Sequence, residues 1–179
     1  MKFELDIDKA IEASLYIINR VNACDMHKLF KILYFAEQQH LAEYGRTITG
    51  DSYVAMQNGP VPSFIYDAIK VVRGDKSYYS INRDLKSEFE VFRYKFIEAK
   101  REANTDYLSA SDIEYLEKSL VENAQLNFAQ LTEKSHDSAW LGAYENSDMD
   151  FFEIAHAGGA TTEMLKYIEV NMQTQNSFK

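Results

Sequence analysis

The side chains that could support nucleophilic or metal chemistry are few. Cys24 and His27 lie three residues apart, just before an apolar segment. A structural metal site built on such a pair needs a second pair at ligand spacing, and none follows, because His40, His136 and His156 are scattered along the chain. A cysteine–histidine nucleophile is conceivable, although a cysteine in this position is more often a buried, inert thiol. We therefore predict no metal site and no cofactor.

Motifs that define common enzyme classes are missing from the sequence. It has no G-x-S-x-G nucleophile elbow, no phosphate-binding loop, no dinucleotide fingerprint and no H-E-x-x-H zinc motif. The 28 acidic residues would bring some pair of carboxylates together in any fold, so they are no evidence of acid–base catalysis. We predict that the protein is not an enzyme. A hydrolase that uses Cys24 with a histidine is the alternative.

Three other residues have both a structural and a functional interpretation. His40 lies on the apolar stripe of a predicted helix, where a core histidine bonded to the backbone is more common than a ligand or a base. Asp51 is expected to cap the turn around it. Trp140 is the only tryptophan, and it either packs in the core or anchors an interface. If the segment after His136 is helical, His136 and Trp140 share one face of that helix.

Helical periodicity and capping signals account for most of the chain. The first helix is predicted from its cap, Asp8, to about residue 22, and the second begins after Asp25 and stops at Gly45. The third is predicted to stop at Gly74. Further helices are predicted from N-terminal capping signals, which lie at 111–114, at 127–130, at Asp150 and at Thr161 or Thr162.

Strands are predicted at two places. Residues 52–57 have strand propensity, and a turn should follow at 58–60, because asparagine and glycine tolerate positive φ. Pro62 suits the first position of the third helix. A second strand is predicted at 92–97, with a hairpin return through 98–109. The predicted fold class is therefore α+β, a mostly α-helical single domain with a small antiparallel sheet or hairpin.

The charge is unevenly distributed along the chain. Residues 1–104 hold 15 basic and 15 acidic side chains, whereas residues 105–179 hold 4 basic and 13 acidic ones and so carry the whole net charge of −9. An acidic surface repels phosphate backbones, so we expect no direct binding to nucleic acid. It suits a basic protein partner, or it is simply a solvated helical surface.

The expected location is the cytoplasm. No segment approaches the ~20 consecutive apolar residues that a membrane span requires, and the N-terminus lacks the pattern of a signal peptide. The single cysteine excludes an intramolecular disulfide, which fits a reducing compartment. We expect no interaction with membranes.

The segment 31–70 carries an extended motif, K-x-L-Y-F-A-x-x-x-H-L-A-x-Y-G-R-x-I-T-G-D-x-Y-V-A-M-x-x-G-P-V-P-S. It resembles the signature of the Panacea domain, the SocA-like antitoxin family, many members of which are labelled phage-associated proteins. The resemblance continues more weakly through 106–109 and 131–140. It implies a Panacea antitoxin-like domain over residues 1–145, with a C-terminal helical extension at 146–179 packed on it.

The resemblance implies an antitoxin that neutralises a cognate toxin, encoded beside it, by direct protein contact. Toxins paired with this domain are of many unrelated kinds, so the family does not name the toxin. A phage- or prophage-encoded regulator that binds a host protein is the alternative within the same class.

The expected contact surface is the glycine–proline turn with the aromatic and soft side chains near it. A rigid turn loses little entropy on binding, and such side chains are enriched at interfaces. The predicted partner-binding residues are Tyr53, Met56, Gly59, Pro60, Val61, Pro62, Tyr66 and Trp140, with His40, Asp51 and His136 in supporting positions. Helix residues of the signature, such as Leu33 and Phe35, are expected to be scaffold.

Overall fold

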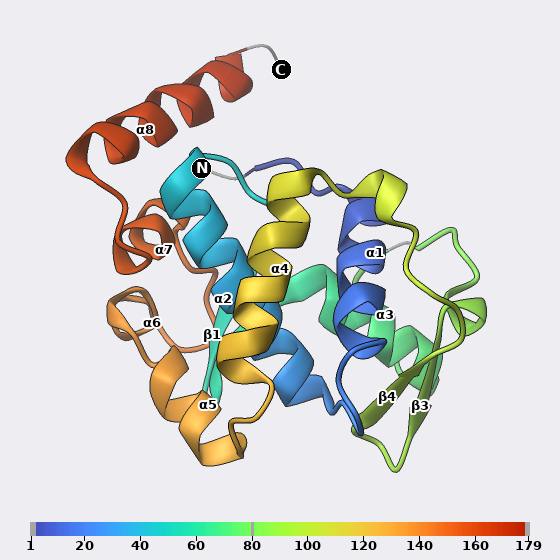
Figure 1. The fold of residues 1–179 in the computed structure, drawn as a ribbon. Coiled ribbons are helices and arrows are strands. Elements are labelled where there is room, and N and C mark those ends of the chain that lie inside the picture. The colour runs from blue at the N-terminus through green and yellow to red at the C-terminus, as the bar shows by residue number, and fades with distance from the viewer. Residues whose placement is uncertain (1–2, 80, 178–179) are drawn as a thin grey trace.

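Helix α2 (Met26–Tyr44) is the centre of the fold. The computed structural model describes residues 3–79 and 81–177, with side chains as far as residue 171. Helix α2 packs against helices on several sides and against the first hairpin (Figure 1). The other helices in the described residues are α1 (Ile7–Ile18), α3 (Ser63–Arg73), α4 (Ala110–Asn123), α5 (Phe128–Ser135), α6 (Ser138–Gly142), α7 (Phe151–Ala157) and α8 (Thr162–Ser177), with short 3-10 helices η1 (Leu85–Ser87) and η2 (Thr105–Tyr107).

The ends of α2 follow the predicted signals. Asp25 caps its N-terminus, where the carboxylate accepts a 2.8 Å hydrogen bond from the Lys28 N–H. Gly45 ends the helix in the left-handed conformation at φ 66°. Between these ends α2 is buried on most of its surface, because it contributes to two hydrophobic clusters. Leu29 and Ile32 lie in the cluster with α1, α3 and the second hairpin, whereas Phe35 lies in the cluster with α6, α7 and α8.

The first hairpin pairs β1 (Tyr53–Met56) with β2 (Gly59–Pro62) in antiparallel register. The sequence predicted a turn at 58–60 and helix at Pro62, and both predictions are wrong. The turn lies at 57–58, and Pro62 is the N-cap of α3. Pro60 lies opposite Ala55 and Pro62 opposite Tyr53. These two residues of β1 form their backbone hydrogen bonds with residues 147–149 and not with β2, since Ala55 N donates to Ser147 O and Tyr53 O accepts from Met149 N. A proline, which has no N–H, is therefore tolerated at both positions of β2.

The second hairpin pairs β3 (Phe89–Phe92) with β4 (Phe96–Ala99). The predicted strand at 92–97 is wrong, as is its return through 98–109, because the chain reverses at 93–95. Arg93 and Tyr94 adopt positive φ, 48° and 65°, a conformation that glycine or asparagine would ordinarily signal. Tertiary hydrogen bonds hold the turn, since Tyr94 O accepts from Arg73 Nη1 and Lys95 O accepts from Met26 N.

Two predicted caps lie two residues from their true positions. Asp6, and not Asp8, caps α1 by accepting from the Lys9 N–H at 3.0 Å. The capping box of α4 is formed by Ser109 with Asp112, and not by residues 111–114. The Asp112 carboxylate fills the role of the expected glutamate. It also forms ion pairs with Lys9 and Arg46, which join α4 to α1 and to the loop after α2.

Polar residues of α2 fix the loop between α2 and β1. Glu37, buried in α2, accepts hydrogen bonds from the N–H groups of Ile48 and Thr49. His40 is fully buried and bonds to the carbonyl of Arg46 and to Ser111 Oγ. The prediction that His40 is a backbone-bonded core residue is therefore confirmed. These residues hold the loop so that the hairpin starts at a fixed place beside α2.

The chain after α6 is joined to the same core. Residues 146–149 run beside β1, where Asn146 N donates to Ala55 O and Met149 N donates to Tyr53 O. Helix α7 begins at its predicted cap, Asp150, and packs against α2. Helix α8 projects from the upper left of the molecule in Figure 1. The observed class, α+β and mostly helical with two small antiparallel sheets, is the predicted one.

Candidate functional site

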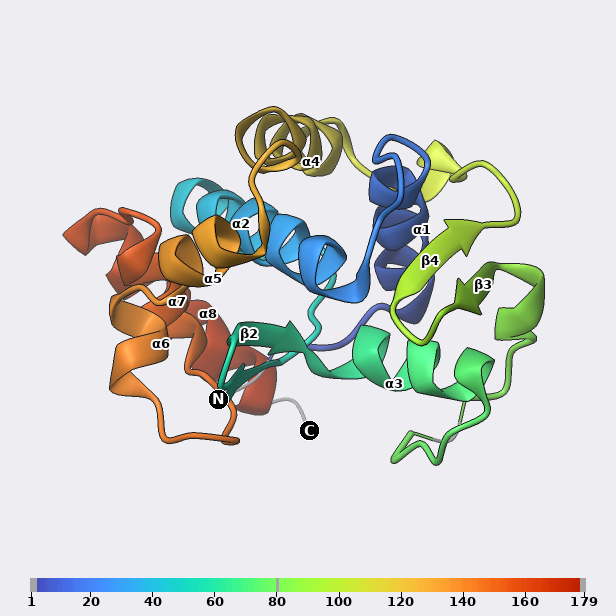
Figure 2. The same cartoon turned by 90° about the horizontal axis from the view of Figure 1, so that it is seen from below.

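A groove of about 510 Å³ opens at the end of the first hairpin. The view from below in Figure 2 looks onto the elements that supply its walls: the start of α2, the β1–β2 hairpin, α3, α5 and the tip of the second hairpin. Its lining is mainly apolar and aromatic, with a few charged groups. The lining residues that matter below are Asp25, His27, Phe30, Lys31, Met56, Gly59, Val61, Tyr66, Lys95, Phe128 and Glu145.

The alternation of the hairpin decides which of its side chains reach the groove. In an antiparallel pair, residues directly opposite one another point to the same face. Met56 pairs with Gly59 and Val54 with Val61, and Met56, Gly59 and Val61 all line the groove. Tyr53 and Ala55 point to the opposite face, into the cluster with α7, so that Tyr53 is 1% exposed.

Gly59 lets the hairpin approach α2 and α5 closely. It adopts φ 96°, which an L side chain rarely tolerates. A Cβ at this position would overlap Ser135 Oγ and lie 2.9 Å from Lys31 Cε. Gly59 is thus required both by backbone conformation and by space.

Lys31 is a buried cation beside the groove. The residue is 1% exposed, and its Nζ donates a 2.8 Å hydrogen bond to the carbonyl of Pro60. Within residues 3–79 and 81–177, no carboxylate forms an ion pair with it. Burial lowers the pKa of the Lys31 ammonium from its usual 10.5 to about 7, because desolvation disfavours the charged form.

His27 forms the wall between Lys31 and α5. Its ring stacks on Phe128 with centroids 4.0 Å apart, and its Nε2 lies 3.0 Å from Thr132 Oγ1. Burial, and then the nearby Lys31 charge, lower the pKa of His27 to about 4. The imidazole is therefore neutral at physiological pH.

His136 and Trp140 support the end of the hairpin. Their rings stack in parallel, with centroids 3.6 Å apart, and the indole Nε1 donates a 2.9 Å hydrogen bond to Met56 O. The predicted proximity of the two residues is confirmed, but they do not share a helix. His136 is the C-cap of α5, and Asp137 is the N-cap of a separate helix, α6. Trp140 lines a second hollow of about 340 Å³ beside Ala55.

The predicted site residues therefore fall into three groups. Met56, Gly59, Val61 and Tyr66 meet in the groove. Trp140 borders the hollow next to it, with His136 stacked behind. The remaining residues are buried, namely Tyr53, Pro60 and Pro62 in the hairpin with His40 and Asp51.

Two predictions for individual residues are wrong. Tyr53 was expected at the surface, but the alternation of β1 turns it into the core. Asp51 was expected to cap its own turn, but its carboxylate accepts hydrogen bonds from Phe64 N and Ile65 N and so caps α3. Burial raises the pKa of Asp51 to about 7, against the lowering effect of these two bonds.

Several groove residues carried no strong signal in the sequence. His27 and Phe128 are brought together by the packing of α5 on α2, which local patterns do not predict. Lys31 had a weak signal, because it is a charged residue in a helix that is apolar on more than one side.

The single cysteine is poorly placed for nucleophilic chemistry. Burial raises the pKa of the Cys24 thiol to about 12, so it is protonated and a poor nucleophile. In the described part of the chain, no group of three or more histidine, cysteine or acidic side chains could hold a metal ion.

A family model, "Antitoxin SocA-like, Panacea domain", matches residues 29–141. The chain belongs to this family. The match runs from the first turns of α2 to α6 and so includes most of the residues that line the groove. Neither a curated protein nor a solved structure matches the chain. The family supports a role of the antitoxin type, and no described helix of this Panacea protein is long and apolar enough to cross a bilayer.

Proposed function

We propose that this Panacea protein is an antitoxin that neutralises a cognate toxin by direct contact, and that the groove beside the first hairpin is the contact surface. The observation that carries the second part is the convergence of four predicted site residues in one mainly apolar groove. Fully desolvated apolar pockets are where interface hot spots concentrate.

The walls of the groove are held rigid by named contacts. Gly59 fits closely against Ser135, Lys31 bonds to Pro60, and Trp140 bonds to Met56. A pre-organised surface loses little conformational entropy on binding, so more of the contact energy appears as affinity. The rim offers Phe128, which is 53% exposed, as a side chain that a partner would cover.

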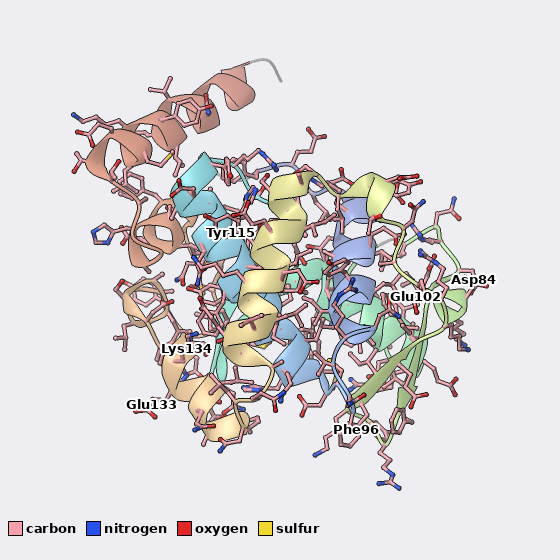
Figure 3. All side chains as sticks on the ribbon, in the orientation of Figure 1. Asp84, Phe96, Glu102, Tyr115, Glu133 and Lys134 are labelled. Atoms are coloured by element: carbon pink, nitrogen blue, oxygen red, sulfur yellow. The ribbon has the colours of Figure 1, made fainter. Side chains whose placement is uncertain are left out.

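Acidic side chains from the second half of the chain lie at and near the groove. Glu133 is exposed on α5 and Glu145 lines the groove (Figure 3 shows Glu133). Negative charge around the groove steers a basic toxin toward it and accelerates association. The protein acts by binding and needs no catalytic step, in keeping with the buried, protonated Cys24.

Co-expression tests the proposal. The product of the gene adjacent to this one should arrest growth alone, and this protein should restore growth and co-purify with that product. Phe128→Glu should abolish rescue and weaken binding by about tenfold or more, as expected for an interface anchor. Val121→Glu is the matched control, because Val121 is 81% exposed on α4 and does not line the groove.

The outcomes separate the two parts of the proposal. If the neighbouring product is harmless, or does not associate with this protein, the antitoxin role fails. If both glutamate variants rescue growth equally, the antitoxin role stands and the groove is not the contact surface. Association with a host protein and with no toxin would instead favour a phage-encoded regulator.

A further inference from the structure

The groove contains a buried cationic side chain, Lys31, for which the described residues supply no counter-charge. The Lys31 ammonium has three N–H donors, and the Pro60 carbonyl takes one of them. In the described residues no carboxylate pairs with Lys31, although the side chain is buried. Buried charges in proteins are normally paired or deprotonated. Lys31 is therefore suited to meet a counter-charge that enters through the groove.

The neighbouring polar groups either have partners within the fold, lack charge, or are exposed to solvent, as Lys95 and Glu145 are. The Asp25 carboxylate accepts from Lys28 N, and the Met26 N–H donates to Lys95 O, so these groups at the start of α2 are engaged within the fold. His27 is neutral, since burial and Lys31 lower its pKa to about 4. Lys31 and Lys95 are thus the cationic side chains of the groove, and Lys31 is the buried one.

Apolar side chains make up most of the remaining wall. Phe30, Met56, Val61 and Tyr66 lie around the groove, and Phe128 stands at its rim. Its volume of about 510 Å³ lies in the range of sites that enclose a ligand. An occupant must therefore present apolar groups and, at the depth of Lys31, one negative charge.

We propose that the groove binds a peptide segment of the partner protein in which an acidic side chain lies beside an apolar one, with its carboxylate on the Lys31 ammonium. The proposal rests on the proposed function and names the chemistry of the partner's contact segment. Chain-end carboxylates are usually held by several backbone N–H groups, whereas the buried cation of this groove is one lysine side chain, which favours an Asp or Glu side chain.

Binding should change the protonation of Lys31. Its pKa of about 7 leaves the amine partly deprotonated at neutral pH. A carboxylate at hydrogen-bond distance favours the charged form and raises the pKa. The complex should therefore take up a proton when it forms near pH 7.5, which calorimetry in two buffers of different ionisation enthalpy measures.

A peptide selection tests the proposal directly. A phage-displayed library of random hexapeptides, embedded in a carrier so that no chain end is free, is selected on the full-length protein. The enriched peptides should contain Asp or Glu next to an apolar residue. Changing that Glu to Gln should weaken binding at least tenfold, and so should Lys31→Met. Lys86→Met is the control, because Lys86 is exposed and does not line the groove.

The comparison of Glu and Gln peptides uses the wild-type protein and stays valid if Lys31→Met fails to fold, which circular dichroism would reveal. Enriched peptides without an acid, equal binding of the Gln peptide, or no enrichment would each overturn the proposal. Phenylacetate, with phenylacetamide as its neutral control, tests whether the carboxylate comes from a small molecule and not from a peptide. Lys31-dependent binding of phenylacetate without any selected peptide would overturn the peptide assignment and indicate a site for small carboxylates.

Failure of this inference is distinguishable from failure of the proposed function. If Lys31→Met folds and neutralises the toxin as well as the wild type does, the role of Lys31 is refuted and the antitoxin role stands. If the wild-type protein neutralises nothing, the antitoxin role fails, and the peptide selection still decides what the groove binds.

Discussion

The indole Nε1 of Trp140 donates a 2.9 Å hydrogen bond to the carbonyl oxygen of Met56. This bond ties α6 to the end of β1. Trp140, the only tryptophan of the chain, therefore has two roles. It holds the backbone of Met56, which lines the groove, and it lines the neighbouring hollow itself. A variant at Trp140 that loses binding must accordingly be checked for loss of stability.

Trp140→Phe should lower the free energy of unfolding by about 1 kcal/mol, because it removes one hydrogen bond and keeps an aromatic ring to stack on His136. Trp140→Ala should cost about 2 kcal/mol or more, since the stacking is lost too. Urea unfolding measures both. Leu141→Ala is the control, because Leu141 is 69% exposed. Equal stabilities of Trp140→Phe and Leu141→Ala would show that the bond contributes nothing.

Gly59→Ala should destabilise the protein more than Gly74→Ala. Both glycines have similar positive φ, 96° and 91°, so both substitutions impose backbone strain of about 1–3 kcal/mol. At Gly59 the new Cβ meets Ser135 and Lys31, whereas at Gly74 no atom of the described residues lies within 4 Å of it. The extra cost should fall when Ser135→Ala is added. Equal thermal shifts for the two alanine variants would refute the close fit.

Lys31 should make stability rise with pH. Because the pKa of Lys31 is lowered to about 7 in the folded protein from 10.5, the unfolded chain binds more protons between these values, and deprotonation relieves a cost of folding. From pH 7 to 9 the wild type should gain about 2 kcal/mol relative to Lys31→Met. Urea unfolding at several pH values measures this difference, and Lys86→Met should follow the wild type. A difference that is independent of pH would contradict the prediction.

Glu133→Lys should slow association with a basic toxin several-fold at low salt, and the effect should shrink as salt is added. Glu133 is exposed on α5 beside the groove, whereas Glu102, also exposed, lies on the other side of the molecule (Figure 3). Glu102→Lys changes the net charge equally and should have the smaller effect. Glu117 is not used as a charge-reversal control, because it accepts hydrogen bonds from Tyr16 and Arg20 and its replacement would also affect stability. Equal rates for the two variants would exclude local steering.

Cys24 should resist alkylation in the folded protein. It is 1% exposed, and burial raises the pKa of its thiol to about 12. Iodoacetamide at pH 8 should label it only after denaturation, as mass spectrometry would show, and Cys24→Ala should retain full antitoxin activity. Rapid labelling of the native protein, or loss of activity in Cys24→Ala with its fold intact, would revive the hydrolase alternative.

Several helix ends were predicted correctly from local signals, although the caps of α1 and α4 were each placed two residues too late. Asp25 and Asp150 cap helices, and Gly45 and Gly74 end them, as expected. A cap is satisfied by backbone groups two or three residues away, so its chemistry is contained in a short window of sequence. The turn at Arg93 and Tyr94 was missed because its positive φ values are held by contacts from α2 and α3 and not by the turn residues themselves.

The sequence by itself determined the family, the mostly helical α+β class and the scaffold role of His40, because the signature and the helix stripes are local patterns. Only the tertiary structure decided which hairpin residues are available to a partner. The pleat directs Tyr53 into the core and Met56 into the groove. The packing of α2, α5 and the hairpin likewise buries Lys31 beside Pro60, with no counter-charge from the described residues. Burial and pairing depend on elements that are distant in the chain, so the sequence did not predict this.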